Sequence, residues 1–291
     1  MLTKKITTVL TLTLLITGTV VSAAPQIAQV ASMFKCIAEV KVKLGQKVKK
    51  GQFLFECNQD ILKIQKKFNE QDLKFNKLVI EGAGKLIKSN AISLADYQES
   101  VKDRINATEA LSLTEIEMKD SKYYAPFDGT VTKIIRYTGS GLGDNDDEIE
   151  VTEGDVLVDT KSPVALVCTR YPGVLELKVK LAQKVKKGDL LFTSNTDAFE
   201  AKEIQTRNLK TYFNHIFTRR KKLLKTHTVS EFLYITAEND YNRAVMNYEI
   251  VKLQIAQSSC HAPFDGTVTE IFRYSGSGNG SGKPVLNITG N

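Results

Sequence analysis

Apolar and polar residues alternate along several short segments, which is the pattern of a β-strand with one buried face. In VLELKVKL the apolar residues Leu177, Val179 and Leu181 are separated by charged residues, and the run TVTKIIRY also alternates. Gly51 and Gly188 each follow a pair of lysines and precede a further apolar run. We expect both glycines to lie in tight turns between strands, with a positive φ.

A helical pattern fills the long segments between these strands. No proline occurs between Asn58 and Ala125, and the first part of that segment has a 3-4-3-4-3 spacing with one polar position: Ile61, Ile64, Phe68, Gln71, Phe75 and Leu78. Ser89-Asn90 predicts a turn, and Ser93 can N-cap a second helix. The stripe of that second helix is Leu94, Tyr97, Val101 and Ile105. The pattern predicts an antiparallel hairpin of two helices, each roughly 28 residues and about 42 Å long.

Two blocks of the sequence occur twice. VKLGQKVKKGQFLF (42–55) matches VKLAQKVKKGDLLF (179–192) at 11 of 14 positions, and APFDGTVTKIIRYTGSG (125–141) matches APFDGTVTEIFRYSGSG (262–278) at 14 of 17. Both pairs have the same offset, from position 42 to 179 and from 125 to 262. The whole unit is therefore a tandem repeat. The helical segment between the blocks diverges, so the second hairpin repeats the pattern with few identical residues.

The N-terminal residues indicate where the protein is located, and the net charge bears on the kind of partner it binds. Lys4 and Lys5 precede an uncharged run, residues 6–21, which ends in small residues before Ala24. This predicts a secretory signal peptide cleaved after Ala23, and so an exported, periplasmic protein. The alternative is an uncleaved N-terminus that associates with the inner membrane. The net charge of +7 is modest, and without a basic and aromatic signature we expect no nucleic-acid partner.

The sequence offers little for catalysis. Its four cysteines include no C-x-x-C, its three histidines are scattered, and no nucleophile–base–acid arrangement is recognisable. We expect no enzymatic activity, no metal site and no cofactor. The acidic run 141–150 lacks the spacing of an EF-hand and is expected to be a solvated loop.

The order of the blocks resembles the periplasmic adaptor proteins, or membrane fusion proteins of the HlyD-like family, in tripartite efflux and type I secretion systems. The resemblance implies an α+β fold of two tandem units. Each unit would be a lipoyl-like (biotinyl-like) β-sandwich, or barrel-sandwich hybrid, with an inserted antiparallel coiled-coil hairpin. Neither D-K-A nor M-K-M occurs, so covalently attached lipoyl or biotin is not expected.

The resemblance also implies domain boundaries. They are a signal peptide at 1–23, a first unit at 24–170 with sandwich halves 34–58 and 122–169 around a hairpin at 59–121, and a second unit at 171–291 with halves 171–195 and 259–291 around a hairpin at 196–258. We expect the second sandwich to be incomplete, since it lacks a counterpart of EVTEGDVLVDT (150–160) in the first. Because the second unit extends to residue 291 of the sequence, we expect no counterpart of the family's β-barrel and membrane-proximal domains. In the lipoyl-like topology the first and last strands adjoin, which implies a disulfide between Cys36 and Cys168.

Family adaptors often carry R-x3-L-x6-S at the hairpin tip, which binds a TolC-type outer-membrane channel. The second repeat has Arg219, Leu223 and Ser230 at this spacing. The first repeat keeps Leu86 and Ser93, with a glycine in place of the arginine. The resemblance further implies an inner-membrane transporter of the ABC or RND class and a homo-oligomer, such as a trimer with six tips.

Two other interpretations of these residues stay open. Arg219 can instead belong to a solvated basic face, RRKK at 219–222. The whole chain can be a periplasmic structural or scaffold protein, whose coiled coils bind one another without any transport role.

Overall fold

The computed structural model describes residues 25–32, 36–142, 147–158, 160, 162–280 and 282–290. Over these residues the protein is α+β, as predicted, and it divides into two compact units. The strand unit contains Met1–Asn58, Ser121–Asn195 and Gln257–Asn291, and the helical unit contains Gln59–Asp120 and Thr196–Ala256. The division into compact units therefore separates the strands from the helices. It does not separate one repeat from the other. The predicted signal peptide, 1–23, lies outside the described residues.

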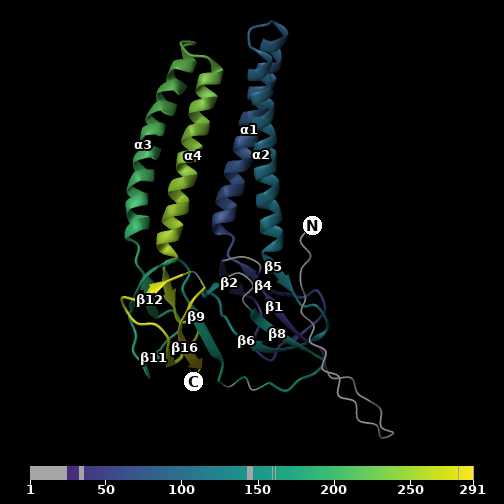
Figure 1. Ribbon diagram of the computed structural model, residues 1–291, viewed down its shortest axis with the longest axis vertical. Helices are drawn as coiled ribbons and strands as arrows, with labels where there is room; N and C mark the ends of the chain where they lie inside the picture. Colours follow the sequence, from purple (N-terminus) through teal and green to yellow (C-terminus); the bar gives the residue numbers. More distant parts are fainter. Residues whose placement is uncertain are drawn as a thin grey trace, which may run out of the picture. The chain divides into compact units, whose positions relative to one another are not determined.

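The helical unit consists of two antiparallel hairpins (Figure 1). The helices are α1 (Asp60–Lys88), α2 (Leu94–Asp120), α3 (Asp197–Lys225) and α4 (Glu231–Ala256). Helix α1 has 29 residues and ends immediately before Ser89, so the predicted turn is confirmed.

Small and polar residues hold the first hairpin together. The Asn69 side-chain amide of α1 donates to the Ala110 carbonyl at 3.1 Å and to the Thr114 hydroxyl at 3.0 Å. Ala107 and Thr114 form the buried face of α2. The predicted stripes are therefore wrong at Leu94 and Ile105, which are 63% and 55% exposed. Leu78 of α1 is exposed as well.

Aromatic residues hold the second hairpin together. The Phe217 ring of α3 stacks on Tyr241 of α4, with centroids 5.5 Å apart, and also contacts Tyr234 at 5.6 Å. The Lys210 ammonium lies 4.3 Å from the centre of the Tyr248 ring. The two hairpins thus share a backbone arrangement but use different side chains to pack.

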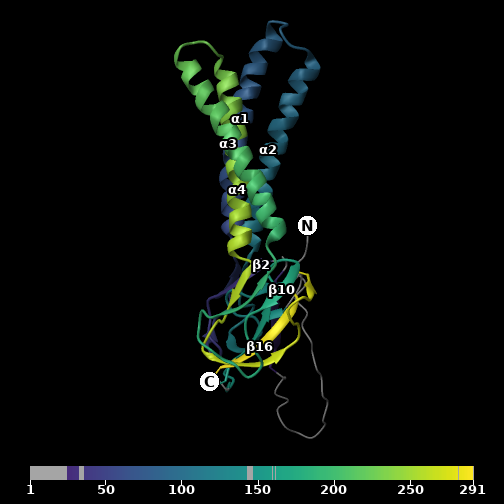
Figure 2. The same ribbon diagram turned by 90° about the vertical axis from the view of Figure 1, so that its left-hand side faces the viewer.

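The hairpins contact each other through α1 and α4 (Figure 2). The Asn239 amide of α4 donates to the Asp72 carboxylate at 3.0 Å, and the Arg243 guanidinium lies 3.6 Å from the same carboxylate. The Arg243 guanidinium also lies 5.8 Å from the centre of the Phe68 ring. This contact joins the first helix of one repeat to the second helix of the other.

The described part of the strand unit contains sixteen strands in four four-stranded sheets. Those of the first repeat are β1 (Ile27–Ala31), β2 (Cys36–Val40), β3 (Lys47–Val48), β4 (Phe53–Cys57), β5 (Lys122–Tyr124), β6 (Gly129–Ile134), β7 (Gly141–Leu142) and β8 (Asp147–Glu153). Those of the second are β9 (Val164–Cys168), β10 (Gly173–Leu177), β11 (Lys184–Val185), β12 (Leu190–Ser194), β13 (Ser259–His261), β14 (Gly266–Ile271), β15 (Gly278–Asn279) and β16 (Pro284–Gly290).

Each repeat forms two sheets with the same strand order. The sheets are β1-β8-β6-β3 and β5-β4-β2-β7 in the first repeat, and β9-β16-β14-β11 and β13-β12-β10-β15 in the second. Each repeat has its own core. Fully buried members are Leu54, Phe55, Val131, Ile149 and Val151 in the first repeat, and Leu191, Phe192, Val268, Leu286 and Ile288 in the second.

The strand pairing corrects two expectations about the second repeat. Strand β9 pairs with β16 just as β1 pairs with β8, and Val164, the first residue of β9, is the counterpart of Ile27 at the constant offset of the repeat. The second repeat therefore begins before β9, not at residue 171. Among the described residues it has the same eight strands as the first repeat, so the expected incompleteness is wrong.

The predicted disulfide between Cys36 and Cys168 is also wrong, because their strands, β2 and β9, belong to different sheets. Strand β2 pairs with β4 and β7, whereas β9, which contains Cys168, pairs with β16. Cys168 is a fully buried thiol, and so is Cys260. Cys57 is disulfide-bonded.

The structure explains why the two sequence blocks are retained together. The Asp128 carboxylate accepts a hydrogen bond from the Lys50 backbone amide at 2.7 Å, and the predicted turn residue Gly51 has φ +79°. In the second repeat Asp265 accepts from Lys187 at 2.7 Å, and Gly188 has φ +91°. The aspartate of each APFDG segment thus accepts a hydrogen bond from the turn of the other block, which contains the lysine pair and the glycine.

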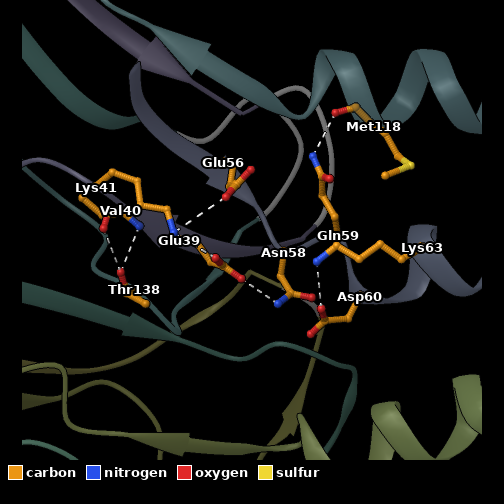
Figure 3. Close-up of polar contacts among 10 residues, drawn as sticks. All are labelled: Glu39, Val40, Lys41, Glu56, Asn58, Gln59, Asp60, Lys63, Met118 and Thr138. Carbon is orange, nitrogen blue, oxygen red and sulfur yellow. Dashed lines mark hydrogen bonds and ion pairs between the residues drawn. The ribbon is translucent and has the colours of Figure 1, made fainter. Parts of the chain in front are cut away.

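A polar network at the strand ends is also repeated. The Asn58 amide donates to the Glu39 carboxylate at 2.7 Å, and Lys41 pairs with Glu39 at 3.2 Å (Figure 3). The Val40 amide donates to the Thr138 hydroxyl at 2.9 Å. In the helical unit, the Gln59 amide donates to the Met118 carbonyl at 2.9 Å and joins the ends of α1 and α2 (Figure 3).

The second repeat keeps the ion pair of this network. Glu176 and Lys178, the counterparts of Glu39 and Lys41, also form an ion pair. The hydrogen bond from Lys178 lowers the pKa of the Glu176 carboxyl.

Candidate functional site

Both hairpins turn through the same backbone motif at their bends. In the first, the Ala91 amide donates to the Leu86 carbonyl at 2.9 Å and the Asn90 amide to the Ile87 carbonyl at 3.1 Å. Asn90 has φ +53°, so it is the left-handed residue of a Schellman motif. Such a motif ends a helix and reverses the chain within a few residues.

The second hairpin repeats the motif at the equivalent place. The Thr228 amide donates to the Leu223 carbonyl at 2.9 Å, and the His227 amide donates to the Leu224 carbonyl at 3.0 Å. His227 has φ +56°. Leu86 and Leu223, both predicted site residues, therefore have the same place in the two bends.

Ser93 and Ser230 cap the helices that leave the bends. The Asp96 amide donates to the Ser93 hydroxyl at 3.1 Å, and the Ser93 amide donates back to the Asp96 carboxylate at 3.1 Å. This reciprocal pair is a capping box. Hydrogen bonds from the Ser93 hydroxyl and amide lower the pKa of the Asp96 carboxyl. Ser230 caps α4 more simply, because its hydroxyl accepts from the Leu233 amide at 3.3 Å.

The two neighbouring arginines of the second tip differ in their surroundings. The Arg220 guanidinium donates to the Leu233 carbonyl at 2.8 Å and so links the end of α3 to the start of α4. Arg219, one residue earlier, is exposed. Arg220 therefore supports the tip, and the Arg219 side chain is accessible to a partner.

The tips differ in what they expose. At the second tip Phe232 and Leu233 are 55% and 41% exposed. At the first tip Leu86 is 47% exposed. Gly82 stands where the arginine is expected, and a Cβ built there meets no atom within 4 Å. Exposed aromatic and leucine side chains beside a capped helix start are the signal that sequence reasoning missed.

The residues at these tips have the chemistry to bind a partner. A cation, a leucine and a hydroxyl at a helix bend can donate to carboxylates or carbonyls and can fill an apolar groove. No group of three or more His, Cys, Asp or Glu side chains that could hold a metal ion occurs among the described residues. Within the same residues, no helix is long and apolar enough to cross a membrane.

Comparison with known proteins gives similarity in structure only. No family model matches the chain, and no curated protein sequence matches it. A putative efflux transporter from Bacteroides eggerthii DSM 20697 is 21% identical over 44% of this chain and 40% of its own length, with a TM-score of 0.41. A MacA–MexA chimeric protein with the Pseudomonas aeruginosa MexA α-hairpin domain is 24% identical over 44% of this chain and 47% of its own, with a TM-score of 0.38.

A third structure, the periplasmic adaptor protein EmrA, covers 91% of this chain and 72% of its own at 13% identity, with a TM-score of 0.18. The solved structures similar to this chain thus include a putative efflux transporter, a MacA–MexA chimeric protein and a periplasmic adaptor protein. The chain spans less than half the length of the first two structures.

Proposed function

We propose that this protein is a periplasmic adaptor of a tripartite efflux or type I secretion system. Its hairpin tips dock onto a TolC-type outer-membrane channel, and the chain links that channel to an inner-membrane transporter of the ABC or RND class. One observation carries the proposal: Arg219, Leu223 and Ser230 stand at the R-x3-L-x6-S spacing around a helix bend, with Arg219 exposed. The chain would be exported and non-catalytic.

The fold fits this role. Each repeat would be a lipoyl-like β-sandwich split by a coiled-coil hairpin, since the helices follow β4 and precede β5 in the first repeat, and follow β12 and precede β13 in the second. The repeats would meet between residues 153 and 164, where β8 ends and β9 begins. In this arrangement the sandwiches anchor two helical arms, and the bends at the ends of the arms make the contact.

The chemistry of docking follows from the tip residues. The Arg219 guanidinium would donate to carboxylates or carbonyls of the channel, and a hydrogen bond to a charged group contributes about 1.5–3 kcal/mol. Leu223 and the exposed Phe232 would fill apolar grooves between channel helices. Each tip contact is small, but two tips on one chain raise the effective concentration of the second contact.

Assembly would multiply these contacts further. Each chain has two hairpins with similar but unequal tips, so three chains present six tips to a three-fold channel with two kinds of groove. We propose a homo-oligomer, most simply a trimer, as the docking form.

The experiment compares two variants of the second tip for binding to a purified TolC-type channel. Arg219→Ala should weaken binding by about 10- to 100-fold, since 1.4 kcal/mol is a factor of ten. Lys221→Ala removes the same charge from nearly the opposite side of the same helix end, about 160° around the helix from Arg219, and should change binding less than threefold. Equal effects of the two substitutions, or unchanged binding in both, would contradict docking through Arg219 and favour a scaffold role.

A further inference from the structure

The first repeat is crossed by an extended segment that leads from β8 toward β9. Its described residues are 154–158 and 160, and we call them the strap. The strap lies against the turn at 43–46 and against β3. The second repeat has the same turn, at 180–183, and the equivalent strand β11. The two surfaces can therefore be compared residue by residue.

Polar contacts hold the strap on the first repeat. The Lys47 ammonium lies 2.8 Å from the Asp155 carboxylate. The Thr130 hydroxyl donates to the Gly154 carbonyl at 2.8 Å and accepts from the Val156 amide at 3.3 Å. The strap is thus bound through one ion pair and through its backbone.

The turn at 43–46 lies in close contact with the far end of the strap. Gly45 has φ +76°, and a Cβ built on it would lie 2.8 Å from Thr160 Cγ2 and 3.9 Å from Val158 Cβ. Val158 and Leu44 also line one cleft. Glycine therefore leaves room for the strap, and an apolar residue of the strap lies beside the leucine of the turn.

The equivalent surface of the second repeat is exposed. Leu181 is 58% exposed, whereas its counterpart Leu44 is half-buried. Ala182 and Lys184, the counterparts of Gly45 and Lys47, are exposed as well. The second repeat thus presents the surface that the strap lies against in the first.

The charge of this surface favours an acidic partner. The segment 180–187 contains four lysines, all exposed, and no acidic residue. In the described part of the chain, no carboxylate pairs with Lys184 as Asp155 pairs with Lys47. An acidic group brought by another molecule would meet complementary charge here.

Ala182 restricts what can bind. It has φ +61°, in the left-handed region that costs free energy for any residue with a Cβ. Its methyl group occupies the place that Gly45 leaves open in the first repeat, where Thr160 comes within 2.8 Å of a built Cβ. A segment bound on the second repeat therefore needs a small residue in place of that threonine.

We propose that Leu181, Ala182 and Lys184 bind an extended acidic segment of a second protein. The segment would place a carboxylate against Lys184, an apolar side chain three residues later beside Leu181, and a glycine five residues later over Ala182. The first two positions are those of Asp155 and Val158 in the strap, and the third is that of its threonine.

The strap of a second copy of this chain fits the surface less well than such a segment. That strap is already bound to its own first repeat. It also carries Thr160, for which the Ala182 methyl group leaves too little room. The favoured occupant is therefore a different protein with the same acidic and apolar spacing.

The test is titration of the full-length protein with synthetic peptides of residues 153–160, followed through the methyl NMR signals of Leu181 and Ala182. The peptide with Thr160→Gly should shift both signals with a dissociation constant below about 1 mM. The unchanged peptide should bind at least about threefold more weakly. The protein variant Ala182→Gly should abolish this difference, because the obstructing methyl group is gone.

A charge exchange tests the ion pair. Lys184→Glu should weaken binding of the Thr160→Gly peptide by about fivefold, and the additional peptide change Asp155→Lys should restore it. Lys202→Glu makes the same charge change at an exposed site on α3 and should leave binding within about twofold of the parent.

Three results would overturn the inference. They are the absence of shifts at Leu181 and Ala182, equal binding of the two peptides to the unchanged protein, and equal effects of Lys184→Glu and Lys202→Glu. Because the titration uses no channel and no tip variant, each result leaves the channel-binding test of Arg219→Ala to be judged separately.

Discussion

The glycine of the repeated APFDGTVT segment should be intolerant of even one added methyl group. A Cβ at Gly129 would lie 2.3 Å from the Thr152 carbonyl oxygen and 3.2 Å from Val151 Cγ1. Since ordinary contacts begin near 3.5 Å, β6 and β8 would have to separate by about 1 Å. Overpacking of this kind costs about 1–3 kcal/mol. The first core, which includes Val131 and Val151, would be disturbed as well.

Urea denaturation of Gly129→Ala measures this cost, with Gly278→Ala as the control. Gly278 also lies in a strand, but a Cβ there meets nothing within 4 Å. The control should be neutral or up to about 1 kcal/mol stabilised, because alanine reduces the freedom of the unfolded chain. The two variants should therefore differ by about 1–4 kcal/mol. Equal midpoints would refute the view that close strand approach fixes this glycine.

Further predictions concern the bends and the buried thiols. His227→Gly should raise the melting temperature, since a non-glycine residue in the left-handed region costs roughly 1 kcal/mol. Ser93→Ala should lower stability by about 1 kcal/mol. The pKa of Asp96 is lowered in the folded state, so its contribution is present at neutral pH and is lost as pH falls through that pKa; Asp96→Asn should remove this acid sensitivity. Burial raises the pKa of the Cys260 thiol to about 11, so peptide mapping should find it alkylated only after unfolding. Gly82→Arg should strengthen channel binding and helix α1 together, by about 1 kcal/mol for the helix.

Local sequence patterns were sufficient to predict the helical hairpins and the tight turns. Long proline-free segments with helical periodicity predicted both hairpins, and Ser89-Asn90 marked the first bend because asparagine tolerates the left-handed conformation. The same holds for Gly51 and Gly188, whose positive φ the structure confirms. Each of these features depends on a few neighbouring residues, which the sequence displays directly.

Features that depend on distant partners could not be predicted from the same patterns. The apolar spacing on α2 suggested a seam through Leu94 and Ile105, but Ala107 and Thr114 are the buried residues. The missing counterpart of EVTEGDVLVDT (150–160) suggested that the second sandwich was incomplete. In the structure β9, which lies before the predicted start of the second unit at 171, pairs with β16. The pairing of strands far apart in the sequence determines where the second repeat begins. It also determines that Cys168 does not lie beside Cys36.

The tip residues show the same limit. The R-x3-L-x6-S spacing predicted Arg219 as a docking residue. The sequence RRKK also contains Arg220, and it does not show which arginine supports the tip and which is exposed. The hydrogen bond from Arg220 to the Leu233 carbonyl distinguishes the supporting arginine from the exposed one. The exposure of Phe232 also depends on where α4 turns, which helical periodicity does not reveal.

The most direct test of the central proposal is crosslinking from the second tip to a TolC-type channel. Ser230→Cys, carrying a short thiol-reactive photocrosslinker, should form a covalent product with the helical tip of the channel. Ser112→Cys makes the same change at an exposed site on α2, about 28 Å along the helix from Ser93, and should form none. A product from Ser112→Cys alone, or from neither variant, would contradict docking through the hairpin tips.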